Sequence, residues 1–330
     1  MTRTGRRRFL FVAWTALAAP MLGHAQQAPR VWRIGFLALR HIGPLETDYF
    51  GEFPRGMREL GYVEGRNLSI EWRSAEGRVE QLAGLAAGMV ERRVDVIVAA
   101  GAQAVHAAQK ATRTIPIVMG TAGDPVGSGF VKSLARPGGN ITGLSDISSD
   151  VSTKLLDLLR SAVPKVSRVA VLINPDNSSH VTLLQNIRVA AQSVGVEIVP
   201  VMAHMPDEIQ TAFAKVMQER ANALVVAADA VFNQQSRQIA DLAASRRLPT
   251  ISGYWQFAEM GGLMSFGQNF GNNFRRAAAY VDRILRGAKP GELPVEQPTR
   301  VEFLVNRKTA QALGLNLPRD ILFRADRVIE

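Results

Sequence analysis

Short apolar runs alternate with amphipathic helical stretches along most of the chain, and the alternation occurs in two successive blocks. Uninterrupted apolar strands that are separated by helices indicate parallel sheets covered by helices on both faces. For the first block, the pattern predicts strands at 33–39, 68–72, 94–99 and 115–119, with helices over 50–60, 82–90 and 102–111.

The second block repeats this rhythm. It predicts helices over 153–162, 179–194, 206–220 and 234–246 and strands at 168–173, 197–202, 223–227 and 249–252. A late group follows, with a helix over 272–286, a proline-spaced segment at 289–298, a strand at 300–305 and a helix over 308–313.

The late elements are too few for a third domain, so we expect them to complete the first two. The fold class predicted is therefore α/β, with two doubly wound, Rossmann-like lobes. The glycine-rich passage from Arg136 to Gly143 is interpreted as the first crossing between them. We expect the first lobe to hold 31–143 plus about 268–298, and the second 144–267 plus about 299–330.

The first 25 residues have the features of an export signal. Arg6, Arg7 and Arg8 precede a short apolar run over 9–19, and small residues flank His24 before a cleavage point at Ala25. The run is too short to span a bilayer. We therefore expect residues 1–25 to be removed and the mature protein to be periplasmic. The paired arginines also resemble a twin-arginine signal, and the sequence leaves the Sec and Tat routes open.

The amino-acid composition of the chain excludes several classes of function. The net charge of +10 falls to +6 without Arg3, Arg6, Arg7 and Arg8, and bases and acids are interspersed, so no nucleic-acid partner is expected. The chain contains no cysteine, which excludes thiolate metal sites, disulfides and a cysteine nucleophile.

No catalytic constellation is apparent. The histidines stand far apart, at His24, His41, His106, His180 and His204, so no metal site is expected. Nucleophile-elbow, Walker and dinucleotide-binding motifs are absent, so we expect no cofactor, no catalytic residues and no enzymatic activity. An exported α/β hydrolase with Asp124 or Asp229 as base stays an alternative.

Polar and aromatic residues at the predicted strand ends indicate ligand binding, because open α/β sheets bind ligands there. The turn at Gly101 leads into a helix whose first N–H groups can hold a carboxylate, although Gly101 can also serve only the turn. Asp124 and Asp229 can meet an amine or cap helices. Candidate ligand-binding residues are Gly101, Ala102, Gln103, Ala104, Thr121, Asp124, Asn174, Asp229, Tyr254, Trp255 and His41. Alternatively, Tyr254 and Trp255 pack under a loop, and His41 is a surface residue.

Several strings give the chain a family resemblance. They are Arg58–Asn67, Gly123–Gly129, Leu134–Gly143, Gly261–Met264, Leu293–Pro298 and Asn306–Ala310. With these strings the chain resembles ABC-transporter substrate-binding proteins of the tryptophan or aromatic amino-acid type, which have the type I periplasmic-binding-protein fold. The resemblance covers about 31–330.

The resemblance implies two lobes, joined by three crossings, that close on a small solute such as an amino acid or a related carboxylate. A monomer that docks on an ABC permease in the inner membrane is expected, and a periplasmic receptor that signals to a kinase is the alternative. The resemblance also implies that 101–104, 121–124, Asn174 and Asp229 face the cleft. The chain has Ala102 and Ala230 where such members often carry a hydroxyl residue and an asparagine.

Overall fold

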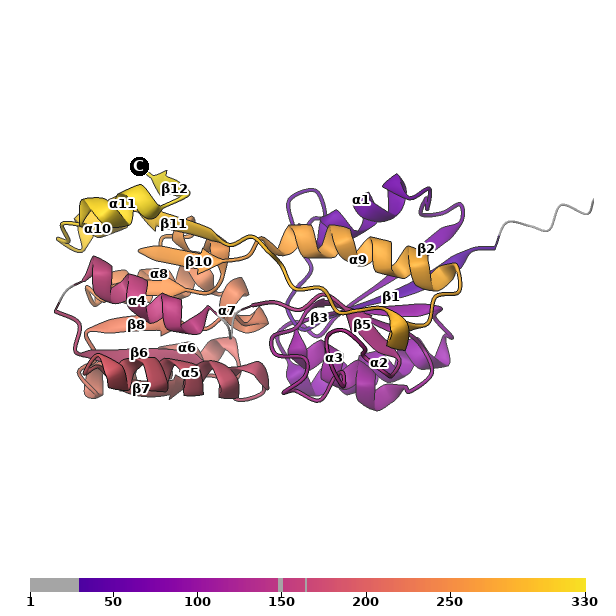
Figure 1. Ribbon diagram of the computed structural model, residues 1–330, viewed down its shortest axis with the longest axis horizontal. Helices are drawn as coiled ribbons and strands as arrows, with labels where there is room; N and C mark the ends of the chain where they lie inside the picture. Colours follow the sequence, from indigo (N-terminus) through magenta and orange to yellow (C-terminus); the bar gives the residue numbers. More distant parts are fainter. Residues whose placement is uncertain (1–29, 148–150, 164) are drawn as a thin grey trace, which may run out of the picture. The chain divides into compact units, whose positions relative to one another are not determined.

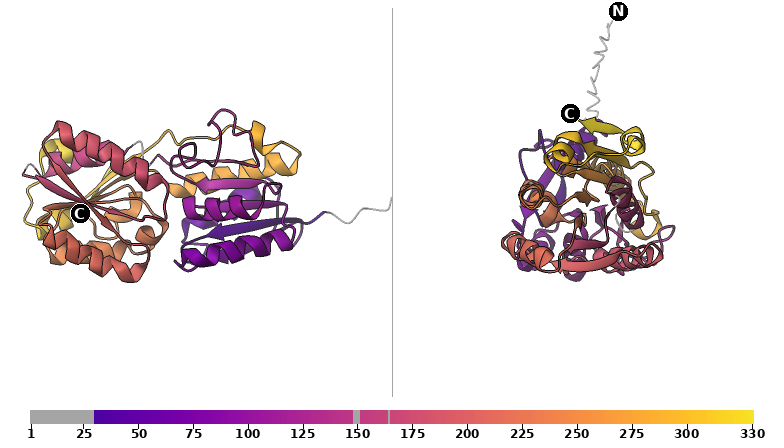
Figure 2. Two further views of the ribbon diagram at one scale, coloured as in Figure 1. Left: turned by 90° about the horizontal axis from the view of Figure 1, so that it is seen from below. Right: turned by 90° about the vertical axis from the view of Figure 1, so that its left-hand side faces the viewer.

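The computed structural model describes residues 30–147, 151–163 and 165–330, so the predicted signal peptide lies outside the described residues. Val31–Glu330 forms one compact unit. It contains two separate sheets (Figures 1 and 2). We call the part built on the five-stranded sheet the first lobe and the part built on the seven-stranded sheet the second lobe.

The sheet of the first lobe is parallel throughout, with strand order β2-β1-β3-β4-β5. Its strands are β1 (Trp32–Ala38), β2 (Leu68–Ser74), β3 (Val96–Ala100), β4 (Ile117–Thr121) and β5 (Ile141–Gly143). Its helices are η1 (Tyr49–Gly51), α1 (Glu52–Glu59), η2 (Val79–Gln81), α2 (Leu82–Glu91) and α3 (Ala102–Ala111), joined late in the chain by α9 (Phe270–Leu285) and η5 (Pro290–Glu292).

The sheet of the second lobe has the order β12-β11-β10-β9-β8-β6-β7. Its strands are β6 (Arg168–Ile173), β7 (Glu197–Met202), β8 (Ala223–Val226), β9 (Thr250–Ser252), β10 (Met264–Gly267), β11 (Glu302–Asn306) and β12 (Arg327–Ile329). Its helices are α4 (Ser152–Ala162), α5 (Ser179–Ser193), η3 (Pro206–Glu208), α6 (Ile209–Gln218), α7 (Ala230–Gln234), α8 (Ser236–Ser245), η4 (Trp255–Ala258), α10 (Arg307–Ala312) and α11 (Arg319–Arg324).

The chain passes between the sheets three times: between β5 and α4, between β10 and α9, and between η5 and β11. Helix α9 belongs to the first lobe because it packs along α1 and against β4 (Figure 1). It buries Phe270 and Phe274, and Phe274 lies edge-on to Phe50 at 4.9 Å between ring centroids. Burial of such aromatic side chains contributes roughly 1.5 to 3 kcal/mol each.

Two expectations from the sequence need correction. The passage from Arg136 to Gly143 is not a crossing, because it ends in β5, whose Ile141 pairs with Ile117 of the first sheet. The second sheet is not wholly parallel, since β10 and β11 run antiparallel. The strands β10 and β12 and the helix α11 were not predicted, because each is too short for a clear hydrophobic period. The helix predicted over 234–246 is divided into α7 and α8.

Among the described residues, none of the helices is both long and apolar enough to cross a bilayer. The fold that results places the carboxyl ends of β1, β3 and β4 beside loops from the second lobe. This placement defines the candidate site.

Candidate functional site

A cavity lies where residues from the two lobes meet, and its volume is about 30 Å³. The sequence predicted five of the residues that line it: Gly101, Ala102, Gln103, Thr121 and Asp229. Gly123, which lies in the 121–124 loop that the resemblance places at the cleft, also lines the cavity. The other lining residues were not among the candidates: Arg40, Tyr49, Phe50, Ala100, Asp146, Asn177, Ala228, Ala230, Asn233 and Phe270.

The helix end predicted to hold an anion is present. Gly101 has a φ of +94°, which favours glycine, and its N–H donates to Thr121 O at 2.9 Å. Helix α3 begins at the next residue, and its first N–H groups have no acceptor within the helix. They give this wall of the cavity a partial positive charge.

Asp229 accepts four hydrogen bonds, two at each carboxylate oxygen. Its Oδ1 accepts from Val231 N at 2.9 Å and from Asn174 Nδ2 at 3.2 Å. Its Oδ2 accepts from Asn177 Nδ2 and from Gln103 Nε2, both at 2.9 Å. The bond to Val231 caps α7, which is one of the two roles considered for this residue. The bond to Gln103 joins the two lobes.

Buried hydrogen bonds fix the loop that presents Asn174 and Asp229. Asn174 N donates to Nδ1 of His180 at 2.9 Å, and Nε2 of the same ring lies 3.2 Å from Ala228 O. The neutral tautomer with its proton on Nε2 satisfies both contacts. His180 therefore holds the ends of β6 and β8 together, and Asn174 orients the Asp229 carboxylate without lining the cavity.

Arg40, two residues after the end of β1, forms a buried ion pair with Asp48. Its Nη1 donates to Asp48 Oδ2 at 2.8 Å, its Nη2 donates to Oδ1, and its Nε donates to Tyr49 Oη at 2.8 Å. The guanidinium carbon lies 3.8 Å from the centroid of the Phe50 ring. The side chains of Arg40 and Asp48 are only 10% and 8% exposed.

Burial tends to raise the pKa of Asp48, but the hydrogen bonds and charge of Arg40 outweigh it, so this pKa lies below its usual range. Burial raises the pKa of Tyr49 and of Tyr254. Both phenols are therefore neutral at pH 7. The wall around Arg40 carries a paired charge and aromatic rings rather than an unpaired cation.

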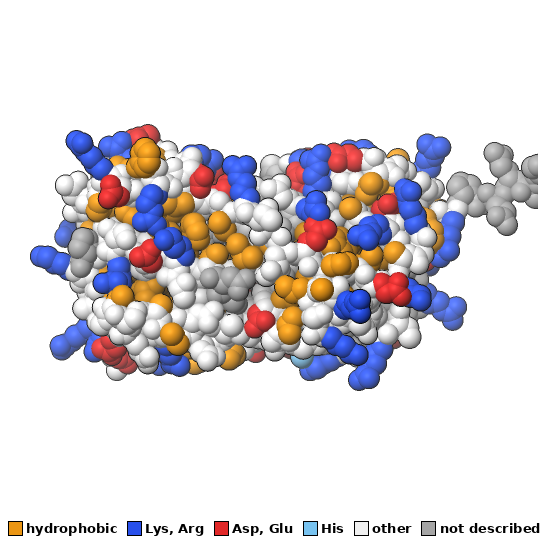
Figure 3. Space-filling model, viewed as in Figure 1, with side chains coloured by type: hydrophobic (Ala, Val, Ile, Leu, Met, Phe, Trp, Pro, Cys, Tyr) orange, Lys and Arg blue, Asp and Glu red, His pale blue; other side chains and the backbone are white. Residues whose placement is uncertain are grey.

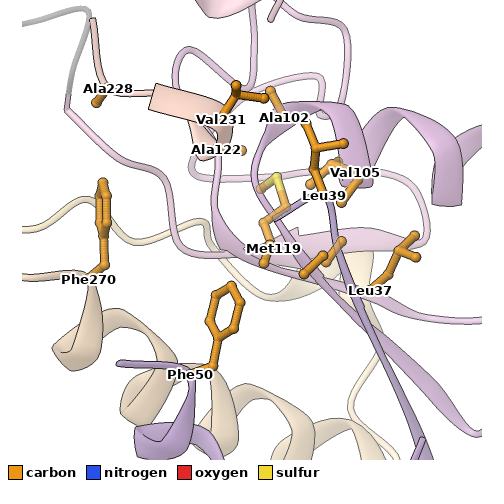
Figure 4. Close-up of a cluster of buried hydrophobic side chains, with 14 of the residues drawn as sticks. Leu37, Leu39, Phe50, Ala102, Val105, Met119, Ala122, Ala228, Val231 and Phe270 are labelled. Atoms are coloured by element: carbon orange, nitrogen blue, oxygen red, sulfur yellow. The ribbon is translucent and has the colours of Figure 1, made fainter. Parts of the chain in front are cut away.

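Aromatic rings form another wall of the cavity. In Figure 4 the rings of Phe50 and Phe270 point toward the upper part of the view, where Ala102 and Ala228 lie. Tyr254 stacks behind Phe270, with centroids 5.8 Å apart and planes 22° apart. A second cavity of about 170 Å³ lies beside the first and shares Arg40, Tyr49 and Asn233 with it; Tyr254 lines this second cavity.

Several predicted residues do not line the first cavity. Ala104 is fully buried, and Trp255 packs against the core, with its Nε1 buried and without a partner in the described part of the chain. His41 is exposed, and its Nδ1 lies 2.7 Å from Glu76 Oε2, so it is placed as the alternative of a surface residue describes. Tyr254 donates its hydroxyl to Gln256.

Asp124 lies at the rim between the lobes. Its Oδ1 accepts from Gly127 N at 2.9 Å, and its Oδ2 accepts from Thr182 Oγ1 of the second lobe at 2.7 Å. The hydroxyls of Ser128 and Ser178 are 2.8 Å apart across the same gap. We call these two pairs the rim contacts. They connect the lobes outside the cavity.

Thr182→Val removes one rim contact while keeping the side-chain shape. The acceptor is the Asp124 carboxylate, and a hydrogen bond to a charged group contributes at least about 1.5 kcal/mol, so the closed population should fall and every ligand should bind about tenfold more weakly. Calorimetric titration with two chemically different ligands checks this. The control is Thr211→Val, an exposed threonine on α6. A loss confined to one ligand would contradict a role in closure.

Among the described residues, no group of three or more His, Asp or Glu side chains is placed to hold a metal ion. The site consists of a positive helix end, the carboxylates of Asp146 and Asp229, the paired guanidinium of Arg40, amides and aromatic rings. These groups suit a small zwitterion with an apolar side chain.

Known proteins resemble this chain over most of its length. A relative named tyrosine-binding protein, from Clostridioides difficile (strain R20291), is 26% identical over 263 residues, which are 80% of this chain and 75% of the relative. A conserved domain protein from Vibrio cholerae has a TM-score of 0.85 at 26% identity, covering 91% of this chain and 100% of that one. An ABC domain from Streptococcus pneumonia in complex with L-Trp has a TM-score of 0.83 at 24% identity, with the same two coverages.

These likenesses agree with the two-lobed fold, which is that of type I periplasmic binding proteins. The model of one family, described as ABC transporter substrate binding protein, matches residues 45–329. That match spans both lobes, and the family consists of solute-binding proteins. The chain therefore belongs to the ABC transporter substrate-binding protein family.

Proposed function

We propose that this protein captures an aromatic amino acid between its lobes and delivers it to an ABC permease in the inner membrane. The observation that carries the proposal is the convergence of a helix N-terminus, the Asp229 carboxylate and the Phe270 ring on one cavity. The relatives support the aromatic class, since one is named tyrosine-binding and another holds L-Trp. We propose that residues 1–25 direct export and that the mature protein acts in the periplasm as a monomer.

The ligand carboxylate is assigned to the N-terminus of α3. The N–H groups of Ala102 and Gln103, which both line the cavity, supply donors there, and the helix dipole favours an anion. The ammonium group is assigned to Asp229, with the Asp146 carboxylate on the same cavity adding negative potential. An amino acid thus meets opposite charges at its two ends.

Binding requires one donor to leave Asp229, because both of its oxygens already accept two hydrogen bonds. Gln103 is the donor we assign to leave, since it alone among the four reaches Asp229 from the first lobe. The ligand ammonium then takes the place of the Gln103 amide. Such an exchange makes the contact between the lobes depend on the ligand.

The volume of the cavity sets a further requirement. About 30 Å³ accommodates a water molecule or two but not an amino acid. The lobes must therefore separate to admit the ligand, and its aromatic ring is assigned to the face formed by Tyr49 and Phe270, whose rings pack together at 5.9 Å between centroids, on the side of the second cavity of about 170 Å³. Closure around the ligand is then a hinge motion at the three crossings.

Thermal unfolding with a matched set of compounds tests the proposal. L-tyrosine is compared with tyramine, which lacks the carboxylate, and with 3-(4-hydroxyphenyl)propionate, which lacks the ammonium. L-tryptophan, L-leucine and L-lysine test the side chain. We expect the aromatic amino acids to stabilise the protein by about 2.7 kcal/mol at a free concentration of a hundred times Kd.

Each analogue should stabilise the protein less than L-tyrosine does. Stabilisation by none of the amino acids would contradict the proposal. So would chemical conversion of a bound compound, since that outcome would favour an enzyme.

A further inference from the structure

A groove on the first lobe, separate from the first cavity, has a volume of about 740 Å³. One wall is a face of α3 that presents His106 and Lys110 at positions i and i+4, and Arg113 lies two residues after the end of this helix. The opposite wall is the loop over 129–141, which contributes Lys132. All four side chains are exposed.

The charged residues around this groove are almost all positive. From Val96 to Ser145 the sequence contains four lysines and arginines but a single acid, Asp124. The Asp124 carboxylate already accepts hydrogen bonds from Gly127 and Thr182. Figure 3 shows Lys and Arg side chains gathered over the part of the first lobe where α2 and α3 lie.

None of the residues lining the groove is an acid. Within the described ranges, neither Lys110 nor Arg113 nor Lys132 has a carboxylate oxygen within 4.0 Å. Like charges that share a groove repel one another, so an anionic occupant relieves that repulsion. Burial and the charge of Lys110 lower the pKa of His106, so this ring is neutral at pH 7 and acts as a hydrogen-bonding group.

The shape of the groove decides which anion fits. Its lining includes the Pro137-Gly138-Gly139 backbone, and a Cβ added at Gly139 would meet no atom within 4 Å, so the groove is open there. An extended peptide can lie along such a surface and place carboxylates against the cationic rim. A lipid bilayer is a less suitable partner, because its broad surface contacts side chains that protrude from a protein and does not enter a groove. Proteins that bind single-stranded nucleic acids stack the bases on aromatic rings, and Phe130, the only Phe, Tyr or Trp among the lining residues, is 5% exposed.

We propose that the groove between α3 and the 129–141 loop is a docking site for an acidic segment of a partner protein. The inference does not depend on which solute the cavity binds. The cationic rim supplies long-range attraction and the carboxylates of the segment pair with Lys110, Arg113 and Lys132. Binding should therefore weaken steeply as the salt concentration rises.

Fluorescence anisotropy with a labelled peptide of alternating glutamate and alanine tests this. The double variant Lys110→Glu/Arg113→Glu should weaken peptide binding about tenfold or more, because like charges then face each other. The charge-matched control is Lys215→Glu/Arg237→Glu, two exposed residues of the second lobe with the same change in net charge. The control should bind the peptide nearly as the parent does.

Three results would overturn the proposal. One is an equal loss in both double variants, which would show only non-specific attraction. Another is no peptide binding even at low salt. The third is binding of the parent to anionic phosphatidylglycerol vesicles that the groove variant loses while its peptide binding is unchanged, since that would assign the groove to a membrane. Thermal unfolding of both variants confirms that they are folded.

Discussion

Arg40→Met is expected to lower the free energy of unfolding by about 3 to 5 kcal/mol, because it leaves the buried Asp48 carboxylate without its partner. The guanidinium also donates to Tyr49 and lies against the Phe50 ring, and both contacts are lost. Urea unfolding measures the effect. The matched control is Arg55→Met, since the pair of Arg55 and Glu52 is exposed and should contribute less than about 1 kcal/mol.

A second variant separates the loss of charge pairing from the loss of packing. In Arg40→Met/Asp48→Asn no buried charge remains, so this double variant should be more stable than Arg40→Met alone. A double variant that is equally unstable would assign the effect to packing against Phe50 and Tyr49. That result would contradict the buried-charge explanation.

The pH dependence follows from the direction of the Asp48 pKa shift. In the parent this pKa is lowered from 3.8, so the pair stabilises the folded state above that pH and the stabilisation is lost as pH falls through the folded pKa. In Arg40→Met, burial without the cation should raise the pKa of Asp48. The stability difference between parent and variant should therefore begin to narrow above pH 3.8, as the pH falls through the raised pKa of the variant, and should go on narrowing down to the lowered pKa of the parent.

The helix and strand pattern was predictable wherever the hydrophobic period was long. The helix over Ala102–Ala111 was predicted with its observed bounds, and β6 likewise. The short strands β10 and β12 were not predicted, because three or four residues carry no clear period and their pairing depends on distant strands. The crossing was misplaced at 136–143 because glycine and proline indicate a turn but not the sheet to which the next strand belongs.

The site was only partly predictable for a similar reason. Strand-end reasoning finds Gly101 and Asp229, because Gly101 directly follows β3 and Asp229 directly follows the apolar run that begins with β8 and ends at Ala228. The same reasoning applies to Arg40, which follows β1. An arginine at that position is expected to be a surface charge from the sequence alone, because its burial depends on its hydrogen bonds to Asp48 and Tyr49 in the folded protein. Phe270 starts a late helix, and only the tertiary fold brings that helix to the first lobe.

Asp229→Asn should reduce the affinity for L-tyrosine about 10- to 100-fold and the affinity for 3-(4-hydroxyphenyl)propionate much less. The substitution keeps an oxygen that caps Val231 but removes the negative charge that meets the ammonium group. A hydrogen bond to a charged group contributes about 1.5 to 3 kcal/mol, which sets this range. Titration calorimetry on both compounds gives the ratio of affinities, which is insensitive to a general weakening of closure.

The ratio of the two affinities also tests whether Asp229 contacts the ligand directly or acts by positioning its loop. Asp207→Asn makes the same charge change at an exposed residue of η3 and should leave both affinities unchanged. If Asp229→Asn weakens the two compounds equally, Asp229 positions the loop through Asn174 and Asn177 rather than binding the ammonium. A loss specific to L-tyrosine instead assigns the ammonium group to this carboxylate, at the position where Gln103 of the opposite lobe donates in the structure, so that one side chain both selects amino acids and couples their binding to the contact between the lobes.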